Sequence, residues 1–310
     1  MSCAYPVDTS NWRNPVYSAL GRPISVPCNS CACCRADNVA RWQARLNFEY
    51  LDKPSCFVTL TMDDFHLDYN RGYYAPTVKR ETFHRFIDKL HHVCPDKFTY
   101  FACAEYGDER YRPHYHIVFF GLDFVKYYRF FSKYWKRGRV DVGPLLSGGI
   151  RYILKYLEKQ KFDKAYNDSV YYDNGLDEPF LSMSPGIGSE VYLAHYDELR
   201  NGLPMVFGSR SIVAPTYYRR KFLRLCSDTV SSSIQYQLNI LRKLRKEASR
   251  MNMSVTDYSS WKAKDRELKL VNRLRSKGIP VRERSIFGHK SYQVSCEDLD
   301  KYVDMCLEVA

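Results

Sequence analysis

The chain has 310 residues, of which 26% are charged and 45% are hydrophobic, and it carries a formal net charge of +12. This length is enough for one large core with an accessory region, or for two domains. It contains no apolar run near the ~20 residues that a membrane span needs, and its N-terminus lacks the basic and apolar segments of a signal peptide. We therefore expect a protein that works in the cytoplasm and has no membrane partner.

Positive charge is concentrated towards the C-terminus. Between Arg219 and Lys277 there are 16 Lys and Arg against 5 Asp and Glu, a local net charge of +11. The chain also contains 26 tyrosines. Basic and aromatic side chains together suit a polyanion that offers phosphates and stackable bases, so we expect a nucleic-acid partner. A solubilising surface is the alternative interpretation of the charge.

Hydrophobic periodicity and strand-forming runs predict a series of elements after an irregular N-terminal arm. In chain order they are a helix at 36–51, a strand at 55–62, a helix at 77–93, strands at 97–107 and 114–122, a helix at 123–138, a strand at 139–145 and a helix at 148–161. The elements from residue 55 to residue 145 follow the order β-α-β-β-α-β. We therefore predict an α+β fold, with an antiparallel sheet of the ferredoxin or RNA-recognition-motif type and helices on one face.

The composition divides the chain into four regions. They are an N-terminal arm with a Cys cluster and a helix (1–54), the α+β core (55–161), a loop-rich extension (162–216) and a basic helical C-terminal region (217–310). In the extension, Pro185–Gly188 predicts a turn, or alternatively a loop that approaches a DNA backbone, since glycine permits close contact. The basic helices either contact DNA phosphates or form a solvated bundle that buries Leu238, Leu241 and Leu244.

Two histidines open the second strand of the predicted hairpin. His114 and His116 are two residues apart, so on a strand both side chains project from the same face. Glu105 lies across from His114 on the neighbouring strand, where a charged residue needs a partner. Two imidazoles and a carboxylate can bind a divalent cation with positions left open, which suits Mg²⁺ or Mn²⁺ acting on a phosphate. The alternative is one surface histidine and one hydrogen-bonded core histidine.

The helix at 148–161 carries two tyrosines on one face. Tyr152 and Tyr156 are four residues apart, and each is followed three residues later by a lysine, Lys155 or Lys159. A tyrosine can attack a phosphodiester to form a covalent phosphotyrosine. Its phenol has a pKa of ~10, so a nearby cation would assist it. Ordinary core or surface aromatics are the alternative interpretation of this pair.

Eleven cysteines occur in the chain, and four of them fall within the segment CNSCACC. Cys28, Cys31 and Cys34 have a Cys-x-x-Cys-x-x-Cys spacing. A structural Zn²⁺ usually takes four ligands, and Cys33 is poorly placed to complete this set, so a distant Cys or His would be needed. A set of reduced thiols is the alternative, and oxidative pairing is disfavoured without an export signal.

Three segments, FVTLTMDD, PHYHIVFFG and YILKYLEK, occur in this order. Together they resemble the three motifs of rolling-circle replication initiators, the HUH endonucleases, and the paired tyrosines resemble the two-tyrosine branch. The segments PCNSCACCRADNVARWQAR, SMSPGIGS and YYRRKF are further similar to the initiators of gokushovirus-type microviruses. The resemblance extends over roughly residues 25–225.

This resemblance implies an HUH endonuclease core that nicks one strand of a viral replicative form at its origin. The two histidines and the glutamate would hold the divalent cation, and one tyrosine would attack to leave a 5′-phosphotyrosine and a free 3′-OH. The second tyrosine would cleave the regenerated origin, and rejoining would release circular single-stranded DNA. The two lysines would stabilise the phosphate or the phenolate. Host helicase and polymerase are the implied partners, in the cytoplasm of the bacterial host.

Three other interpretations are compatible with parts of the sequence. A non-catalytic nucleic-acid-binding protein with an RNA-recognition-motif sheet would expose aromatics on its middle strands. A plasmid relaxase or transposase of the same superfamily would share the chemistry, but relaxases generally use a third histidine ligand, and none lies at a suitable strand position. A zinc-dependent interaction protein would need the Cys cluster alone.

Overall fold

A computed structural model describes residues 3–13, 24–51, 53–107, 111–159, 168–196, 205–207, 210–212, 215, 217–218, 221, 229–286, 289–294 and 301. The chain divides into two compact units, one formed by Met1–Trp42 with His195–Ala310 and the other by Gln43–Ala194. Helix α1 (Ala32–Tyr50) runs from the first unit into the second. None of the helices in the described ranges is both long and apolar enough to cross a membrane.

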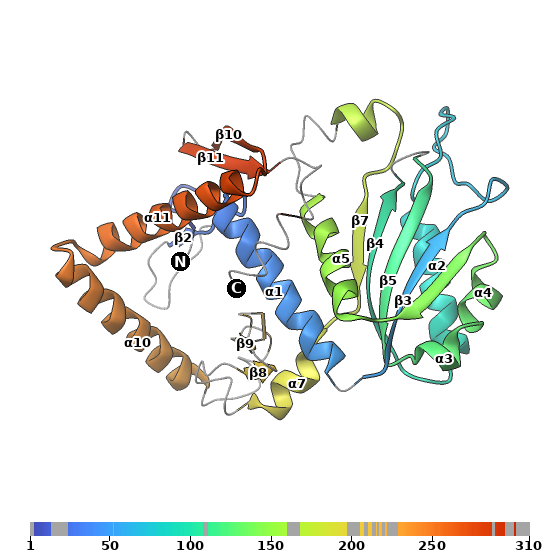
Figure 1. Ribbon diagram of the computed structural model, residues 1–310, viewed down its shortest axis with the longest axis horizontal. Helices are drawn as coiled ribbons and strands as arrows, with labels where there is room; N and C mark the ends of the chain where they lie inside the picture. The colour runs from blue at the N-terminus through green and yellow to red at the C-terminus, as the bar shows by residue number, and fades with distance from the viewer. Residues whose placement is uncertain are drawn as a thin grey trace. The chain divides into compact units, whose positions relative to one another are not determined.

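The second unit is built on a five-stranded antiparallel sheet (Figure 1). In spatial order its strands are β6 (Val140–Pro144), β3 (Ser55–Thr61), β5 (Pro113–Phe120), β4 (Thr99–Tyr106) and β7 (Phe180–Met183). The first four have the fourth-first-third-second order expected for a β-α-β-β-α-β unit of the ferredoxin type. The predicted α+β class is confirmed. Strand β7, in the region expected to be loop-rich, was not predicted.

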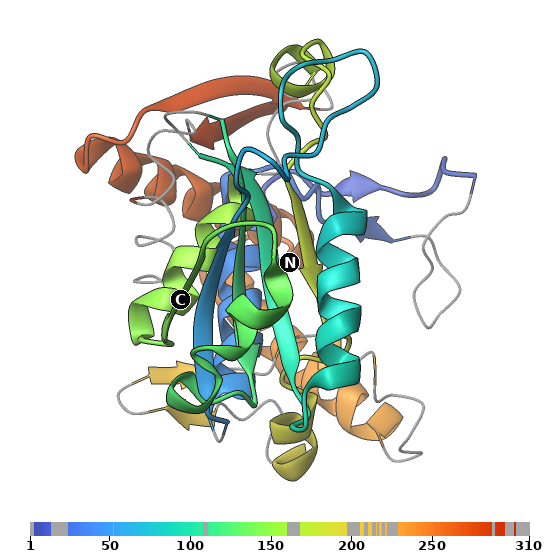
Figure 2. The same cartoon turned by 90° about the vertical axis from the view of Figure 1, so that its right-hand side faces the viewer.

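Helices cover both faces of this sheet. The helices α2 (Arg80–Val93), α3 (Phe124–Tyr127) and α4 (Phe130–Trp135) lie on the face turned to the viewer in Figure 2. The opposite face carries α5 (Ser147–Lys159) and the end of α1, where the Tyr50 hydroxyl donates to the Leu145 carbonyl at 3.1 Å. The π-helical turn η1 (Asp168–Tyr172) and α7 (Ser189–Ala194) flank β7 in the chain.

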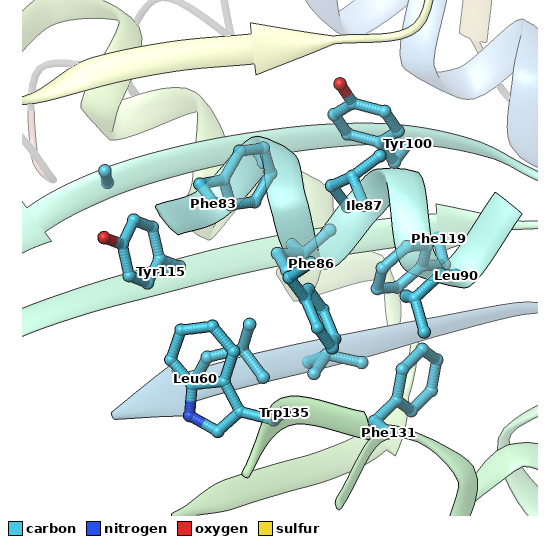
Figure 3. Packing of buried hydrophobic residues seen from close by; sticks show 14 of the residues in the cluster. Leu60, Phe83, Phe86, Ile87, Leu90, Tyr100, Tyr115, Phe119, Phe131 and Trp135 are labelled. Atoms are coloured by element: carbon cyan, nitrogen blue, oxygen red, sulfur yellow. The ribbon is translucent and has the colours of Figure 1, made fainter. Parts of the chain in front are cut away.

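The main hydrophobic core lies between the sheet and α2, α3 and α4 (Figure 3). Alternate residues of each strand enter it, such as Leu60, Tyr115 and Phe119, and α2 contributes Phe83 and Leu90. Burying one side chain of this size stabilises the fold by roughly 1.5–3 kcal/mol. Because strand side chains alternate between faces, this core commits the intervening residues, among them the two histidines, to the opposite face.

The helix predicted at 123–138 is two short helices instead of one. Its expected stop at Gly138 is also wrong, since α4 ends at Trp135 and Lys136 adopts the left-handed conformation with φ 48°. Gly138 has φ +138°, and a side chain there would collide with the backbone of Thr61 and Asp63. The glycine therefore allows close packing against the end of β3 and does not cap a helix.

The first unit contains the remaining elements. They are β1 (Val7–Asp8), β2 (Ser25–Val26), the start of α1, β8 (Met205–Phe207), β9 (Arg210–Ile212), α10 (Thr229–Arg250), α11 (Val255–Ser276), β10 (Val281–Ile286) and β11 (His289–Val294). The long helices α10 and α11 confirm the helical character of the basic region, whereas the β10–β11 hairpin was not predicted. Leu238 is 40% exposed, so its predicted place on a buried face is wrong, and Ala248 is the buried residue of α10 among those that the structure describes.

Candidate active site between the sheet and helix α5

The strand register places the predicted ligands on one face of the sheet. On β5, His114 pairs with Thr61 of β3 on one side and with Glu105 of β4 on the other. His116 pairs with Thr59 and Cys103 in the same two strands. All of these side chains alternate with residues of the main core, so they project together towards α5.

Two threonines of β3 hold the two imidazole rings. The Thr59 hydroxyl lies 3.1 Å from His116 Nδ1, and the Thr61 hydroxyl lies 3.0 Å from His114 Nδ1. A hydroxyl can donate or accept, so each threonine orients its ring in either tautomer and leaves Nε2 for the site. The sequence analysis noted the Thr-Leu-Thr segment without assigning it a role, although its two-residue spacing matches that of the histidines.

Glu105 connects the histidines to the tyrosine helix. The predicted register across from His114 is confirmed, but the carboxylate reaches diagonally to His116, with 2.8 Å between Glu105 Oε1 and His116 Nε2. The same oxygen accepts a hydrogen bond of 2.7 Å from the Tyr156 hydroxyl. Both Glu105 and His116 are buried, so these bonds compensate for removing the carboxylate from water.

The two predicted tyrosines lie against His116. The Tyr156 ring stacks on the imidazole with 5.5 Å between ring centroids and an interplanar angle of 15°, and the Tyr152 ring meets it edge-on at 5.4 Å. Their hydroxyls are 2.9 Å apart. Tyr152 is 38% exposed and Tyr156 is 3% exposed, so a substrate reaches Tyr152 more directly.

A lysine of the same helix covers both phenol rings. Lys155 Nζ lies 4.0 Å from the Tyr152 ring centroid and 5.0 Å from that of Tyr156. A cation in this position is attracted by the ring and favours a phenolate. Lys159, the second predicted lysine, is the last residue of α5, and its role stays a prediction.

Two groups of the site have shifted proton affinities. Burial raises the pKa of the Tyr156 hydroxyl, and the negative charge of Glu105 raises it further. Burial also lowers the pKa of His114, and the neighbouring His116 adds to this effect. Tyr156 therefore keeps its proton while His114 favours the neutral form that a metal ligand needs.

The donor set matches the chemistry of a site for a hard divalent cation. It offers two imidazoles oriented by hydroxyl groups and one carboxylate, which are ligands that Mn²⁺ and Mg²⁺ accept. Within the described parts of the chain, the sole group of three or more ligand atoms that all lie within 4.8 Å of one another is formed by cysteines elsewhere. The three predicted ligands, His114, His116 and Glu105, are thus adjacent but not drawn together to that distance.

A glycine makes room for one of the histidines. A side-chain carbon at Gly107 would lie 2.8 Å from His114 Nε2, closer than such carbons approach other atoms. Gly107 follows the first strand of the hairpin and donates its N–H to the Arg112 carbonyl at 2.9 Å. Sequence reasoning assigned it no role, and the register that brings it next to His114 was the only signal for one.

The Pro185–Gly188 segment forms a turn, as one of the two predictions had it. Gly186 and Gly188 adopt φ +79° and +75°, a conformation that favours glycine. The Gly188 N–H donates a short hydrogen bond to the buried carboxylate of Glu49, which also binds Lys53. This turn is therefore anchored to the end of α1.

Residues 55–161 match the model of the replication-associated protein ORF2 family. The α+β core, with its histidine strand and tyrosine helix, is thus a domain of that family. This finding confirms the resemblance to phage replication proteins on which the sequence analysis relied.

Replication-associated proteins of three phages are similar to the chain over longer stretches. It is 28% identical over 267 residues to replication-associated protein ORF2 of Spiroplasma virus 4, which covers 76% of this chain and 80% of the relative. Identity to replication-associated protein VP4 of Bdellovibrio phage phiMH2K is 28% over 158 residues, or 44% of this chain and 49% of the relative. For replication-associated protein ORF4 of Chlamydia phage 1 it is 24% over 240 residues, or 70% and 58%. No solved structure matches the chain. These relatives support a role in the initiation of replication.

Proposed function

We propose that the protein is a rolling-circle replication initiator of the HUH type, which nicks one DNA strand at a viral origin and later rejoins it. The observation that carries this proposal is the continuous contact from Tyr152 through Tyr156 to Glu105 and His116. A tyrosine pair joined in this way to a buried carboxylate and an imidazole has the parts of a site for nucleophilic attack on a phosphodiester.

Tyr152 is the first nucleophile in this mechanism because it is the more exposed tyrosine. Its oxygen forms a bond to the phosphorus, and the bond from phosphorus to the 3′ oxygen breaks. The products are a 5′-phosphotyrosine and a 3′-OH that can prime synthesis, after the 3′ oxygen takes a proton. The proton of Tyr152 passes to the Tyr156 oxygen, and Tyr156 passes its own proton to Glu105, along contacts of 2.9 and 2.7 Å.

Positive charge assists this attack. Lys155 lies over both rings and favours the developing phenolate, and Lys159 is proposed to bind the phosphate. A divalent cation, Mg²⁺ or Mn²⁺, held by His114, His116 and Glu105 would polarise the scissile phosphate and offset its growing charge.

The second tyrosine explains how a circle is closed. After one round of synthesis, Tyr156 attacks the regenerated origin and becomes the new 5′-phosphotyrosine. The 3′-OH released by this cleavage attacks the phosphotyrosine on Tyr152, forms a phosphodiester and returns the phenol. Two tyrosines 2.9 Å apart at their hydroxyls can alternate without releasing the DNA.

The proposed partners are the replicative-form origin and single-stranded DNA, with host helicase and polymerase, in the cytoplasm of the bacterial host. The basic helices α10 and α11 are proposed to contact phosphates without reading sequence. Where the structure describes the chain, the exposed large hydrophobic side chains lie outside β3, β4 and β5. This argues against a purely stacking sheet of the RNA-recognition type, and the phage relatives favour an initiator over a plasmid relaxase or a transposase.

The test is a cleavage assay on a single-stranded oligonucleotide that spans the origin of the encoding genome. We expect a covalent protein–DNA adduct with Mn²⁺, none with EDTA, and none with the double variant Tyr152→Phe/Tyr156→Phe. Tyr115→Phe is the matched control, since this buried tyrosine lies on the same strand as the histidines but faces the main core. Tight binding to a verified origin without any adduct would overturn the proposal.

A further inference from the structure

Four cysteine thiols converge in the first unit, away from the sheet. Cys3 comes from the N-terminal arm, Cys28 and Cys31 precede α1, and Cys34 lies in its first turn. All four are buried, and their Sγ atoms all lie within 4.8 Å of one another. The sequence analysis required a distant fourth ligand for the Cys-x-x-Cys-x-x-Cys segment, and the structure supplies Cys3.

The sulfur–sulfur distances are those of ligands that share a metal. They are 3.4 Å from Cys3 to Cys28, 4.0 Å from Cys3 to Cys31 and 4.0 Å from Cys28 to Cys34. A tetrahedral zinc with Zn–S bonds of ~2.3 Å separates its sulfurs by about 3.8 Å. A disulfide requires ~2.05 Å, and all four cysteines are free thiols.

Backbone N–H groups are directed at three of these sulfurs. The Cys31 N–H donates to Cys28 Sγ at 3.3 Å, the Cys34 N–H to Cys31 Sγ at 3.4 Å, and the Cys28 N–H to Cys3 Sγ at 3.3 Å. The cluster also adjoins the N-terminal end of α1, a helix of 19 residues. Both features favour negatively charged sulfur, which is the metal-binding form of cysteine.

Cys33 distinguishes this arrangement from a general crowding of thiols. It is as buried as Cys31, with both at 0% exposure, yet its sulfur is not among the four that converge. Consecutive helical residues point in directions about 100° apart, so Cys33 is turned away from its neighbours. The cluster therefore selects a ligand set rather than gathering every nearby cysteine.

We propose that Cys3, Cys28, Cys31 and Cys34 bind a structural Zn²⁺. Four thiolates close the coordination sphere, so the ion has no open position for catalysis. The site links the N-terminal arm, including the β1–β2 hairpin, to the start of α1. Glu267 of α11 accepts a hydrogen bond of 3.3 Å from the Ala32 N–H at this point. The zinc thus holds three segments of the first unit together, independently of the nickase chemistry.

The test is the metal content of the full chain purified without chelators and with a phosphine reductant. We expect about one zinc per chain in the wild type and in Cys33→Ser, and a large loss of zinc in Cys3→Ser and Cys28→Ser. Cys33→Ser is the matched control because it removes an equally buried thiol of the same helix turn.

Cobalt substitution of the wild type gives a second result that does not depend on how well the variants fold. Co²⁺ should produce the intense visible bands of tetrahedral coordination together with a strong sulfur-to-metal charge-transfer band, and Zn²⁺ should displace it. A wild type that holds no zinc and gives no such spectrum would overturn the proposal. Full zinc content in Cys3→Ser would also overturn it, as would bound iron in place of zinc.

Discussion

Replacing Tyr156 by Phe separates the two roles that the mechanism gives to this residue. The change removes one hydroxyl and retains the ring that stacks on His116. The hydroxyl bonds to the Glu105 carboxylate at 2.7 Å and meets the Tyr152 hydroxyl at 2.9 Å. In the mechanism it relays the proton of Tyr152 during the first cleavage and is the nucleophile of the second.

A hydrogen bond to a charged group contributes about 1.5–3 kcal/mol. If the relay stabilises the transition state to this extent, the first cleavage slows by roughly 10- to 100-fold in Tyr156→Phe, since each 1.36 kcal/mol corresponds to about tenfold in rate. Adduct formation still occurs, because Tyr152 is intact. The joining step, which needs both tyrosines, is lost.

The assay is single-turnover adduct formation on an origin oligonucleotide, followed by transfer to a second strand with a free 3′-OH. Tyr115→Phe controls for stability, because the Tyr115 hydroxyl also bonds in a buried place, to the Lys79 backbone at 3.1 and 3.2 Å. A wild-type rate of first cleavage in Tyr156→Phe would refute the relay. Loss of all adduct in Tyr156→Phe, with adduct retained in Tyr152→Phe, would reverse the order of the tyrosines.

The remaining predictions concern the groups that hold the site and its surroundings. Thr59→Val and Thr61→Val remove the hydroxyls that orient the imidazoles, so each should raise the Mn²⁺ concentration for half-maximal adduct formation by roughly 10- to 100-fold; an unchanged Mn²⁺ titration would contradict this. Chelation by EDTA should abolish adduct formation, and added Mn²⁺ should restore it; activity that persists after full chelation would exclude a metal-assisted attack. Burial raises the pKa of Glu49, but bonds from Lys53, a backbone N–H and a threonine hydroxyl outweigh it and hold that pKa below its ordinary 4.5. The stability that Glu49 contributes is therefore complete above pH 4.5 and is lost as the pH falls through the lowered pKa. Thermal unfolding should show Glu49→Gln destabilised at pH 7 and much less so in acid, while Glu190→Gln, whose side chain is 77% exposed, changes little at either pH.

The parts of the fold that depend on local patterns were predictable. The alternation along β5 and the short connection from β4 bring Glu105 opposite His114, and helical spacing puts both tyrosines on one face of α5. These are consequences of strand and helix periodicity within about 50 residues of chain, so the residue pattern alone carries them.

The parts that depend on distant segments were not predictable. Strand β7 has four residues and pairs with β4 across some 75 residues of sequence, which no local pattern specifies. Cys3 joins the cluster across 25 residues, and the spacing of the other cysteines could not select it from the remaining ones. The diagonal bond from Glu105 to His116 is a side-chain choice made within a correct register.

The most direct test of the central claim is to identify the residue that carries the DNA in the covalent adduct. Trypsin cuts after Lys155, so Tyr152 and Tyr156 fall on separate peptides, 152–155 and 156–159. We predict that mass spectrometry of the adduct from a first, single cleavage finds a nucleotide remnant on the peptide 152–155. A remnant on any peptide outside these two, or an origin cut without a covalent adduct, would contradict the proposed attack by a tyrosine of helix α5.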